Sequence, residues 1–309
     1  MYGNNCIGSS RHSPERCGAS LIDVLLACGI LGLLISMMMP AVQAARDAAA
    51  RADCQSRLRQ HGLALHQYSD IHGWLPPPIS FLQSKPRQIP ANLGWQAVLL
   101  PFLDEATLWQ SIVEACAIEP ITIYNPPHTG LASHVPILTC PSDSRLTSAL
   151  TDRNGVKATF TSYLGVSGSG HTRGDGVIVS SPAVRLVHIT DGLSSTLMVG
   201  ERPPPDSLQA GWWYTALIDS KWIDADARGP SLAMSVTIAG ATTPCVGPFE
   251  YGFGRLDNPC DRFHFWSLHS NGGNWVFADG SARFIAYSAR SIMPALASRA
   301  GGEVIELRD

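Results

Sequence analysis

Residues 19–40 read ASLIDVLLACGILGLLISMMMP, an apolar run that contains one charged residue, Asp23. At a helical rise of about 1.5 Å, about twenty residues span the hydrocarbon core of a bilayer. The preceding leader, residues 1–18, is polar and slightly basic and ends at Gly18. A cleaved secretory signal has a shorter apolar core and a small-residue cleavage site after it, and this run has neither. The pattern predicts that the leader is removed and that residues 19–39 remain as a transmembrane helix.

Asp23 is costly in this setting, because a carboxylate at the bilayer centre costs roughly 2.5–3.5 kcal/mol and less near a helix end. If the chain is cut after Gly18, Ala19 gains a free α-amine. Asp23 then lies one helical turn further along, on the same face. It can pair with that amine or with the amine of a neighbouring subunit, or it can simply reach headgroup water. The spacing leaves these alternatives open.

The helix is expected to continue beyond Pro40 as an amphipathic segment, residues 40–72. A proline bends a helix without ending it when neighbouring groups satisfy the freed carbonyl. We therefore expect one kinked helix from Leu21 to Tyr68 that stops at His72-Gly73. The expected buried face, at the helical spacing of three to four residues, comprises Ala41, Ala45, Ala48, Ala52, Leu58, Leu65 and Tyr68.

The body, residues 73–309, is rich in Gly, Pro, Ser and Thr with short apolar runs, which predicts a mainly β structure. The candidate strands are Val177–Ser180, Thr196–Gly200, Trp212–Leu217, Phe263–Leu268, Trp275–Ala278 and Arg283–Tyr287. Trp95–Leu103 and Ala106–Ala115 look helical. The predicted fold class is α+β: a long N-terminal helix packed on a mainly antiparallel sheet, with large irregular insertions.

Charge and cysteine content exclude some functions. The net charge is −3 and 15% of residues are charged, so no basic face suggests a nucleic-acid partner. The absence of C-x-x-C argues against a zinc ribbon and a thioredoxin-like site. Five of the eight cysteines follow the expected transmembrane helix, so at least one of them is unpaired within the chain: Cys54, Cys116, Cys140, Cys245 and Cys260. We expect Cys245 to pair with Cys260, since both follow a proline and a loop of that size is worth roughly 3 kcal/mol.

The N-terminus resembles that of type IV prepilins and type II secretion pseudopilins: a basic leader, glycine, Ser-Leu-Ile and an acid at the fifth mature position. The resemblance implies that a prepilin peptidase cuts between Gly18 and Ala19 and that Asp23 guides assembly with other pilin-like subunits. Pro40, at the twenty-second mature position, matches a helix kink of that class. Two residues depart from the pattern, since Ala19 replaces the usual Phe and Asp23 the usual Glu.

The remainder of the chain is similar to the large bacterial family of unknown function numbered 1559. The segments that carry this resemblance are 43–68, 93–109, 137–143, 161–170, 189–203 and 254–284. The C-terminal signature of that family, a histidine, nine residues and Asp-Gly, corresponds here to His269, Asp279 and Gly280 within the segment 269–280. The resemblance implies kinship with pseudopilins and an envelope location, and it implies no biochemical activity.

Conventional catalytic strings are missing: the chain has no H-E-x-x-H, Walker A or G-x-S-x-G sequence. The glycine-rich stretch 165–170 lacks the Lys-Ser/Thr of a phosphate loop and is expected to be a flexible turn. Arg173-Gly174-Asp175, an adhesion-like tripeptide, is also expected to be an ordinary turn.

Two further sets of residues are weaker candidates for ligand sites. Asp257, Asn258 and Asp261 offer oxygen ligands that suit calcium, although Asx residues beside proline are also ordinary turn formers. No other cofactor or metal is expected. Four tryptophans can either stack on sugar rings or fill the core, and core packing is the more frequent explanation. They are Trp212, Trp213, Trp222 and Trp266.

His269 and Asp279 are expected to be architectural. Asn271-Gly272 and Asp279-Gly280 each resemble a hairpin turn, so the segment predicts a three-stranded meander in which His269 pairs with Asn274. Asp279 would then lie roughly 16 Å from His269 at strand rise, far beyond the roughly 3 Å of a hydrogen bond. Trp275 and Phe277 would share one strand face, with Val276 and Ala278 on the other. Asp279→Ala should therefore lower thermal stability.

The function predicted from these patterns is non-enzymatic. We expect a single-pass pseudopilin-like protein of the bacterial inner membrane, with its body in the periplasm or at the cell surface. A prepilin peptidase would process it, and it would join a pilus- or secretion-type assembly. The alternative is a membrane-anchored extracytoplasmic module that binds a glycan or protein and never polymerises.

Overall fold

The computed structural model describes residues 21–80, 89–90, 92–151, 155–170, 173–180, 182–208, 210–215, 231–236 and 245–303. Gly18 and Ala19 therefore lie outside the described residues, as does the side chain of Asp23. The chain divides into two compact units, Met1–Arg46 and Asp47–Asp309.

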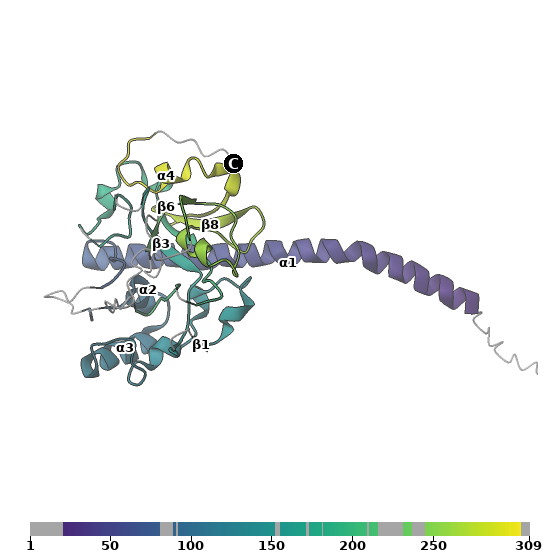
Figure 1. Ribbon diagram of the computed structural model, residues 1–309, viewed down its shortest axis with the longest axis horizontal. Coiled ribbons are helices and arrows are strands. Elements are labelled where there is room, and N and C mark those ends of the chain that lie inside the picture. Colours follow the sequence, from purple (N-terminus) through teal and green to yellow (C-terminus); the bar gives the residue numbers. More distant parts are fainter. Residues whose placement is uncertain are drawn as a thin grey trace, which may run out of the picture. The chain divides into compact units, whose positions relative to one another are not determined.

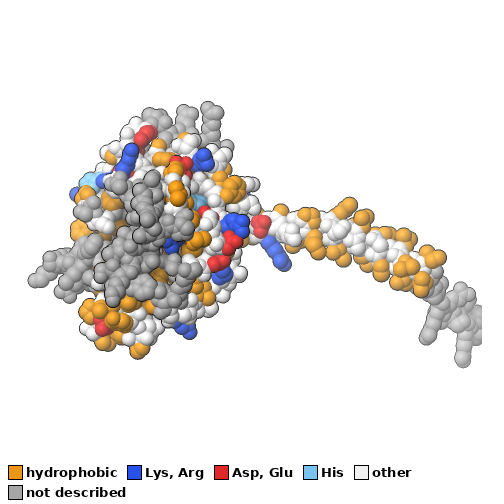
Figure 2. All heavy atoms as spheres, viewed as in Figure 1, with side chains coloured by type: hydrophobic (Ala, Val, Ile, Leu, Met, Phe, Trp, Pro, Cys, Tyr) orange, Lys and Arg blue, Asp and Glu red, His pale blue; other side chains and the backbone are white. Residues whose placement is uncertain are grey.

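Helix α1 (Leu21–His72) begins in the first unit and continues into the second. It runs through Pro40 without ending, as expected. Its large apolar side chains between Leu21 and Val42 are exposed, and they make the surface of this part of the helix largely hydrophobic (Figure 2). Among the described residues, α1 is the one helix long and apolar enough to cross a membrane, and its apolar window is not buried by the rest of the chain.

The second unit, Asp47–Asp309, is called the body from here on. It is built on a five-stranded sheet of order β5-β3-β4-β8-β9, of which Figure 1 labels β3 and β8. Its strands are β3 (Tyr163–Gly168), β4 (Leu197–Glu201), β5 (Ser231–Ala233), β8 (Gly272–Phe277) and β9 (Ala282–Ala286). Every neighbouring pair is antiparallel except β3 and β5, which are parallel. The body is thus an α+β structure on a mainly antiparallel sheet, as predicted.

Two hydrophobic cores cover the sheet. The first includes Cys54, Leu58 and Leu65 of α1, and the second includes Met293 and Leu296 of α4 (Met293–Leu296). Strand β8 is buried along its whole length and contributes to both cores. Its side chains alternate as expected, because those at 276 and 278 belong to the first core and those at 275 and 277 to the second. The part of α1 within the body therefore packs on the sheet through its first core.

The other elements are short. The helical segments are α2 (Trp95–Leu99), η1 (Leu100–Phe102), α3 (Ala106–Ile118), η2 (Thr129–Ala132), η3 (Pro136–Leu138), η4 (Ser144–Thr147), η5 (Leu186–His188), η6 (Leu193–Ser195), η7 (Pro259–Phe263) and η8 (Tyr287–Ala289). Two small hairpin-like pairs complete the body: β1 (Leu150–Thr151) with β2 (Lys157–Ala158), and β6 (Ser235–Val236) with β7 (Phe249–Glu250).

Several predicted elements are confirmed and others are wrong. The predictions for β4, β8, β9, α2 with η1, and α3 hold within a few residues. Val177–Ser180 is not a strand, and neither is Phe263–Leu268, because Phe263 ends η7 and the residues after it are irregular chain. In place of the predicted strand Trp212–Leu217 there are isolated bridges at Trp212 and Thr215, and residues 216–217 lie outside the described part.

The glycine-rich stretch at 165–170 was wrongly expected to be a flexible turn. Residues up to Gly168 belong to β3, which lies in the middle of the sheet. A Cβ on Gly165 would lie 2.7 Å from Cγ2 of Ile178, so glycine is needed there for close packing. Glycine content alone does not distinguish a turn from a tightly packed strand.

The buried face expected for the amphipathic segment is correct only in its second half. Leu58, Leu65 and Tyr68 are buried, whereas the alanines of the first half are exposed. Those alanines are Ala41, Ala45, Ala48 and Ala52. The alanine-rich surface of α1 is therefore not covered by the described part of the chain.

His61 of α1 makes the stability of the body depend on pH. It is fully buried against Trp95 and Tyr163, with ring centroids 6.0 and 5.3 Å away, and its Nδ1 lies 3.0 Å from the Arg57 carbonyl. Burial lowers the pKa of His61 from 6.5 to about 4. The folded body thus holds a neutral imidazole, while the unfolded chain binds a proton below about pH 6.5.

We expect the free energy of unfolding to fall by about 3 kcal/mol through this residue as the pH drops from about 6.5 to about 4. His61→Phe should remove that part of the pH dependence and leave stability at pH 7.5 nearly unchanged. Urea denaturation of both proteins across this pH range measures the difference. Parallel pH profiles for the two proteins would contradict the assignment.

Candidate functional site

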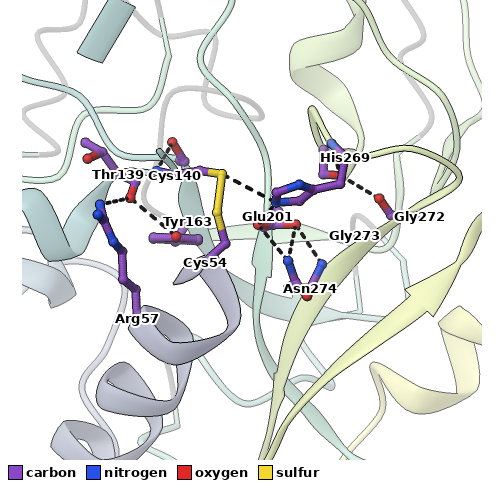
Figure 3. Close-up of polar contacts among 12 residues, drawn as sticks. Cys54, Arg57, Thr139, Cys140, Tyr163, Glu201, His269, Gly272, Gly273 and Asn274 are labelled. Atoms are coloured by element: carbon purple, nitrogen blue, oxygen red, sulfur yellow. Dashed lines mark hydrogen bonds and ion pairs between the residues drawn. A yellow bond between two sulfur atoms is a disulfide. The ribbon is translucent and has the colours of Figure 1, made fainter. Parts of the chain in front are cut away.

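Four buried side chains from four distant segments meet at the centre of the body (Figure 3). Cys54 comes from α1, Cys140 follows η3, Glu201 ends β4 and His269 precedes β8. Their ligand atoms all lie within 4.8 Å of one another. Cys54 and Cys140 form a disulfide with a Cα–Cα distance of 5.4 Å. His269 Nε2 lies 3.5 Å from Cys140 Sγ and 3.2 Å from Glu201 Oε1. We call these residues the four-residue cluster.

The carboxylate of Glu201 is held on its other side by Asn274 of β8. The Asn274 backbone N–H donates to Oε2 over 2.7 Å, and its side-chain amide lies 3.2 Å from Oε1 and 3.3 Å from Oε2. A buried charge must be paired and hydrogen-bonded. Because β4 and β8 are neighbours in the sheet, Asn274 lies close enough to pair with Glu201. The arrangement orients Oε1 of Glu201 toward His269.

The cluster ties α1 to the loop that follows η3, and further bonds reinforce the same contact. Arg57 Nη1 donates to the carbonyl of Thr139 over 2.7 Å, and the Tyr163 hydroxyl donates to it over 3.4 Å. Burial, followed by the negative charge of Glu201, raises the pKa of Tyr163 well above its ordinary value. Tyr163 therefore remains a neutral donor, and the cluster is embedded in hydrogen-bonded structure.

His269, the histidine of the signature, lies in a turn that is closed by hydrogen bonds. The predicted meander placed this residue wrongly. β8 pairs with β4 and β9, so His269 has no strand partner and does not pair with Asn274. Ser267 holds the turn instead: its hydroxyl donates to Gly272 O over 2.5 Å and accepts from the His269 backbone N–H over 3.0 Å. The imidazole is directed to the disulfide and Glu201.

The Asp279-Gly280 turn connects β8 and β9, as expected, and it packs directly on α1. The Asp279 carboxylate accepts from Ser281 N over 2.8 Å and lies 3.5 Å from Arg283 Nη2. A Cβ on Gly62 of α1 would lie 3.0 Å from Cα of Gly280, whose φ is 81°. Asp279 and His269 therefore contact different partners, and the signature touches α1 at two separate places.

Other candidate residues are used within the body. Arg255 binds both oxygens of Asp257, at 2.9 and 2.7 Å, and lowers the pKa of that carboxyl. Asp261 Oδ1 accepts from Asn258 Nδ2 over 2.9 Å and lies 3.1 Å from His264 Nε2. The three calcium candidates thus stabilise their own loop.

The adhesion-like tripeptide and the tryptophans are likewise part of the packed body. Both oxygens of Asp175 accept from Ser169, at 2.8 and 2.7 Å. Trp213 and Trp266 are buried, and Trp212 packs edge-on against the ring of Phe160. Trp222 lies outside the described residues. Trp213 and Trp266 therefore fill the core, and Trp212 packs against it.

A second disulfide joins Cys245 and Cys260, which is the pairing expected from the sequence. Cys116 is free, as is Cys28 in the first half of α1. Burial raises the pKa of the Cys116 thiol to about 11, so it is a poor nucleophile at neutral pH.

Sequence reasoning missed four of the residues around the cluster. Cys54 and Cys140 lie 86 residues apart, and no spacing rule connects them. Glu201 does carry a signal, since it ends the apolar run Leu-Met-Val-Gly, where a carboxylate is costly to bury. Asn274, within the apolar strand β8, is the complementary polar residue.

We expect Glu201→Ala to lower the free energy of unfolding by about 3 kcal/mol, because it leaves His269 and the Asn274 amide buried without an acceptor. Glu201→Gln, which keeps an acceptor oxygen, should cost clearly less. Thermal and urea denaturation of the oxidised proteins measures both effects. Equal losses for the two variants would show that the hydrogen bonds contribute little.

Comparison with known proteins places the chain in a family. Neither the curated proteins nor the solved structures contain a match. A family profile described as "Protein of unknown function (DUF1559)" matches residues 43–290, which include every member of the four-residue cluster and the whole signature. The chain therefore belongs to the DUF1559 family.

Proposed function

We propose that this protein is a non-enzymatic, pilin-like subunit of the bacterial envelope, anchored by the first part of α1 with its body outside the cytoplasm. A prepilin peptidase cuts it between Gly18 and Ala19, and Asp23 then guides its assembly with other pilin-like subunits. The observation that carries the proposal is the uncovered surface of α1. The apolar residues between Leu21 and Val42 are exposed, and so is the alanine-rich stretch that follows.

The two exposed stretches of α1 need partners, and their compositions indicate a membrane for the first and other helices for the second. Contiguous exposed apolar surface marks membrane or protein contacts. Residues 19–39 have the length and composition of a membrane span, whereas the small residues from Ala41 to Ala52 allow helices to approach closely. A subunit that is held in the membrane and packs its helix against other copies would cover both stretches.

The two disulfides support a location outside the cytoplasm. Disulfides persist in oxidising compartments such as the bacterial periplasm and are rare where cellular thiols stay reduced. Cys54–Cys140 and Cys245–Cys260 both lie in the body. A body in the periplasm or at the cell surface, with the inner membrane as the anchor, would fit these bonds.

The geometry of the four-residue cluster favours a non-enzymatic role. Its members are each at most 8% exposed. The oxygens of Glu201 are engaged by Asn274 and His269, and His269 and Asp279 do not meet. General acid–base chemistry needs a group within reach of substrate, and these groups contact only the body itself.

Cross-linking in intact cells tests the proposal. Formaldehyde treatment of cells that produce the native chain is expected to give a ladder of multimers. Asp23→Asn should weaken the ladder while the protein stays in the membrane, and Asp70→Asn, a matched charge loss at an exposed position of α1 outside both stretches, should leave it unchanged. A lone monomer for the native chain would contradict assembly and favour an anchored binding module.

A further inference from the structure

The four-residue cluster contains a disulfide, and its side chains are also of the types that form a zinc site. Thiolate, imidazole and carboxylate are the three ligand types that bind Zn²⁺ in proteins, usually four together in a tetrahedron. Cys54 and Cys140 supply two thiolates, His269 supplies an imidazole and Glu201 supplies a carboxylate. Because the four come from segments far apart in sequence, the spacing rules for zinc motifs do not detect this set.

Two of the separations between the donor atoms match those in a zinc tetrahedron. With Zn–S bonds of about 2.3 Å and Zn–N and Zn–O bonds of about 2.1 Å, sulfur and nitrogen lie about 3.6 Å apart, and nitrogen and oxygen about 3.4 Å. The Cys140 Sγ–His269 Nε2 and His269 Nε2–Glu201 Oε1 distances are 3.5 and 3.2 Å. Two thiolates on one zinc ion lie about 3.8 Å apart, so the sulfur–sulfur bond must open before both cysteines can bind.

The surroundings resemble those of a preorganised metal site. Metal-ligating carboxylates are themselves hydrogen-bonded, and these outer partners fix their orientation. The Asn274 backbone holds Oε2 of Glu201 and its side-chain amide lies near both oxygens, while Oε1 also faces His269 Nε2 at 3.2 Å (Figure 3). The Ser267 hydroxyl holds the backbone of His269. Both ligands would therefore be positioned before any ion arrives.

We propose that the reduced chain binds one Zn²⁺ through Cys54 Sγ, Cys140 Sγ, His269 Nε2 and Glu201 Oε1. The disulfide and the zinc site are thus alternative links between α1 and the loop that follows η3. A dithiol reductant opens the disulfide: two electrons and two protons pass to the cysteine sulfurs, and the reductant becomes a disulfide. Zn²⁺ then displaces the two thiol protons to solvent, and His269 binds through Nε2 with its remaining proton on Nδ1. The proposal rests on the body alone and is independent of membrane anchoring or assembly.

Metal analysis of the full chain in detergent tests the proposal. The chain is reduced with dithiothreitol, freed of it without oxygen, and given Zn²⁺ or Co²⁺ alone. We expect one equivalent of zinc per reduced chain and none in the oxidised chain. The Co²⁺ form should show the thiolate charge-transfer and strong visible bands of a tetrahedral ion. These spectra come from the native sequence, so the test does not depend on a variant that folds.

Variants then locate the site. Cys54→Ser with Cys140→Ser should abolish zinc uptake, whereas the matched pair Cys245→Ser with Cys260→Ser should retain it. Asn274→Ala should weaken binding by about 10–100-fold, the usual cost of losing an outer partner. The proposal is overturned if the reduced native chain takes up no metal, if its Co²⁺ spectrum is octahedral, or if uptake survives loss of Cys54 and Cys140.

Discussion

Replacing Cys54 and Cys140 together by serine is expected to lower the free energy of unfolding of the oxidised body by about 4.5 kcal/mol. The two cysteines are 86 residues apart, so their bond closes a long loop and removes much of the entropy of the unfolded chain. For a body of this size the loss corresponds to a fall in Tm on the order of 10 °C. Urea denaturation of the full chain in detergent, followed by tryptophan fluorescence, measures it.

The second disulfide provides the matched control. Cys245 and Cys260 are 15 residues apart, and the same loop-entropy relation gives about 3 kcal/mol for their bond. Cys245→Ser with Cys260→Ser should therefore cost less than the Cys54 and Cys140 pair. An equal or larger loss for the short loop would contradict the view that the long-range bond is the main covalent link in the body.

Gly18→Leu is expected to abolish removal of the leader, the largest effect of any single substitution considered. The proposed cut follows Gly18, and only a residue without a side chain lets the peptidase approach the backbone closely. The uncut precursor should accumulate in the membrane with its basic leader attached. Immunoblotting of membranes from cells that contain a prepilin peptidase separates the two forms by size.

Gly8→Leu is the control for that experiment, because it makes the same change elsewhere in the leader, away from the proposed cut. The leader of this variant should be removed as in the native chain. Normal processing of Gly18→Leu would show that the cut, if it occurs, lies at another bond.

The features that the sequence predicted are those encoded by neighbouring residues. Helix α1 follows from a long apolar and then amphipathic pattern, and the β8–β9 hairpin follows from Asp279-Gly280 between two apolar runs. The alternation of Trp275 and Val276 correctly assigns the two faces of β8. Each of these inferences needs only a local period or a turn.

The features that it did not predict depend on the order of strands. Glu201 meets Asn274 because β4 and β8 are neighbours, although 73 residues separate the two. Cys54 meets Cys140 only once α1 lies on the sheet. Gly165 suggested a turn because its composition does not reveal that Ile178 packs against it. Such long-range contacts have no local pattern, so the four-residue cluster became visible only in the folded chain.

The N-terminal sequence and intact mass of the protein extracted from bacterial membranes show whether the leader is removed and the helix kept. We expect a mature chain that begins at Ala19, retains the apolar part of α1 and remains in the membrane fraction. A mature N-terminus at Met1, or one beyond Met39, would contradict it.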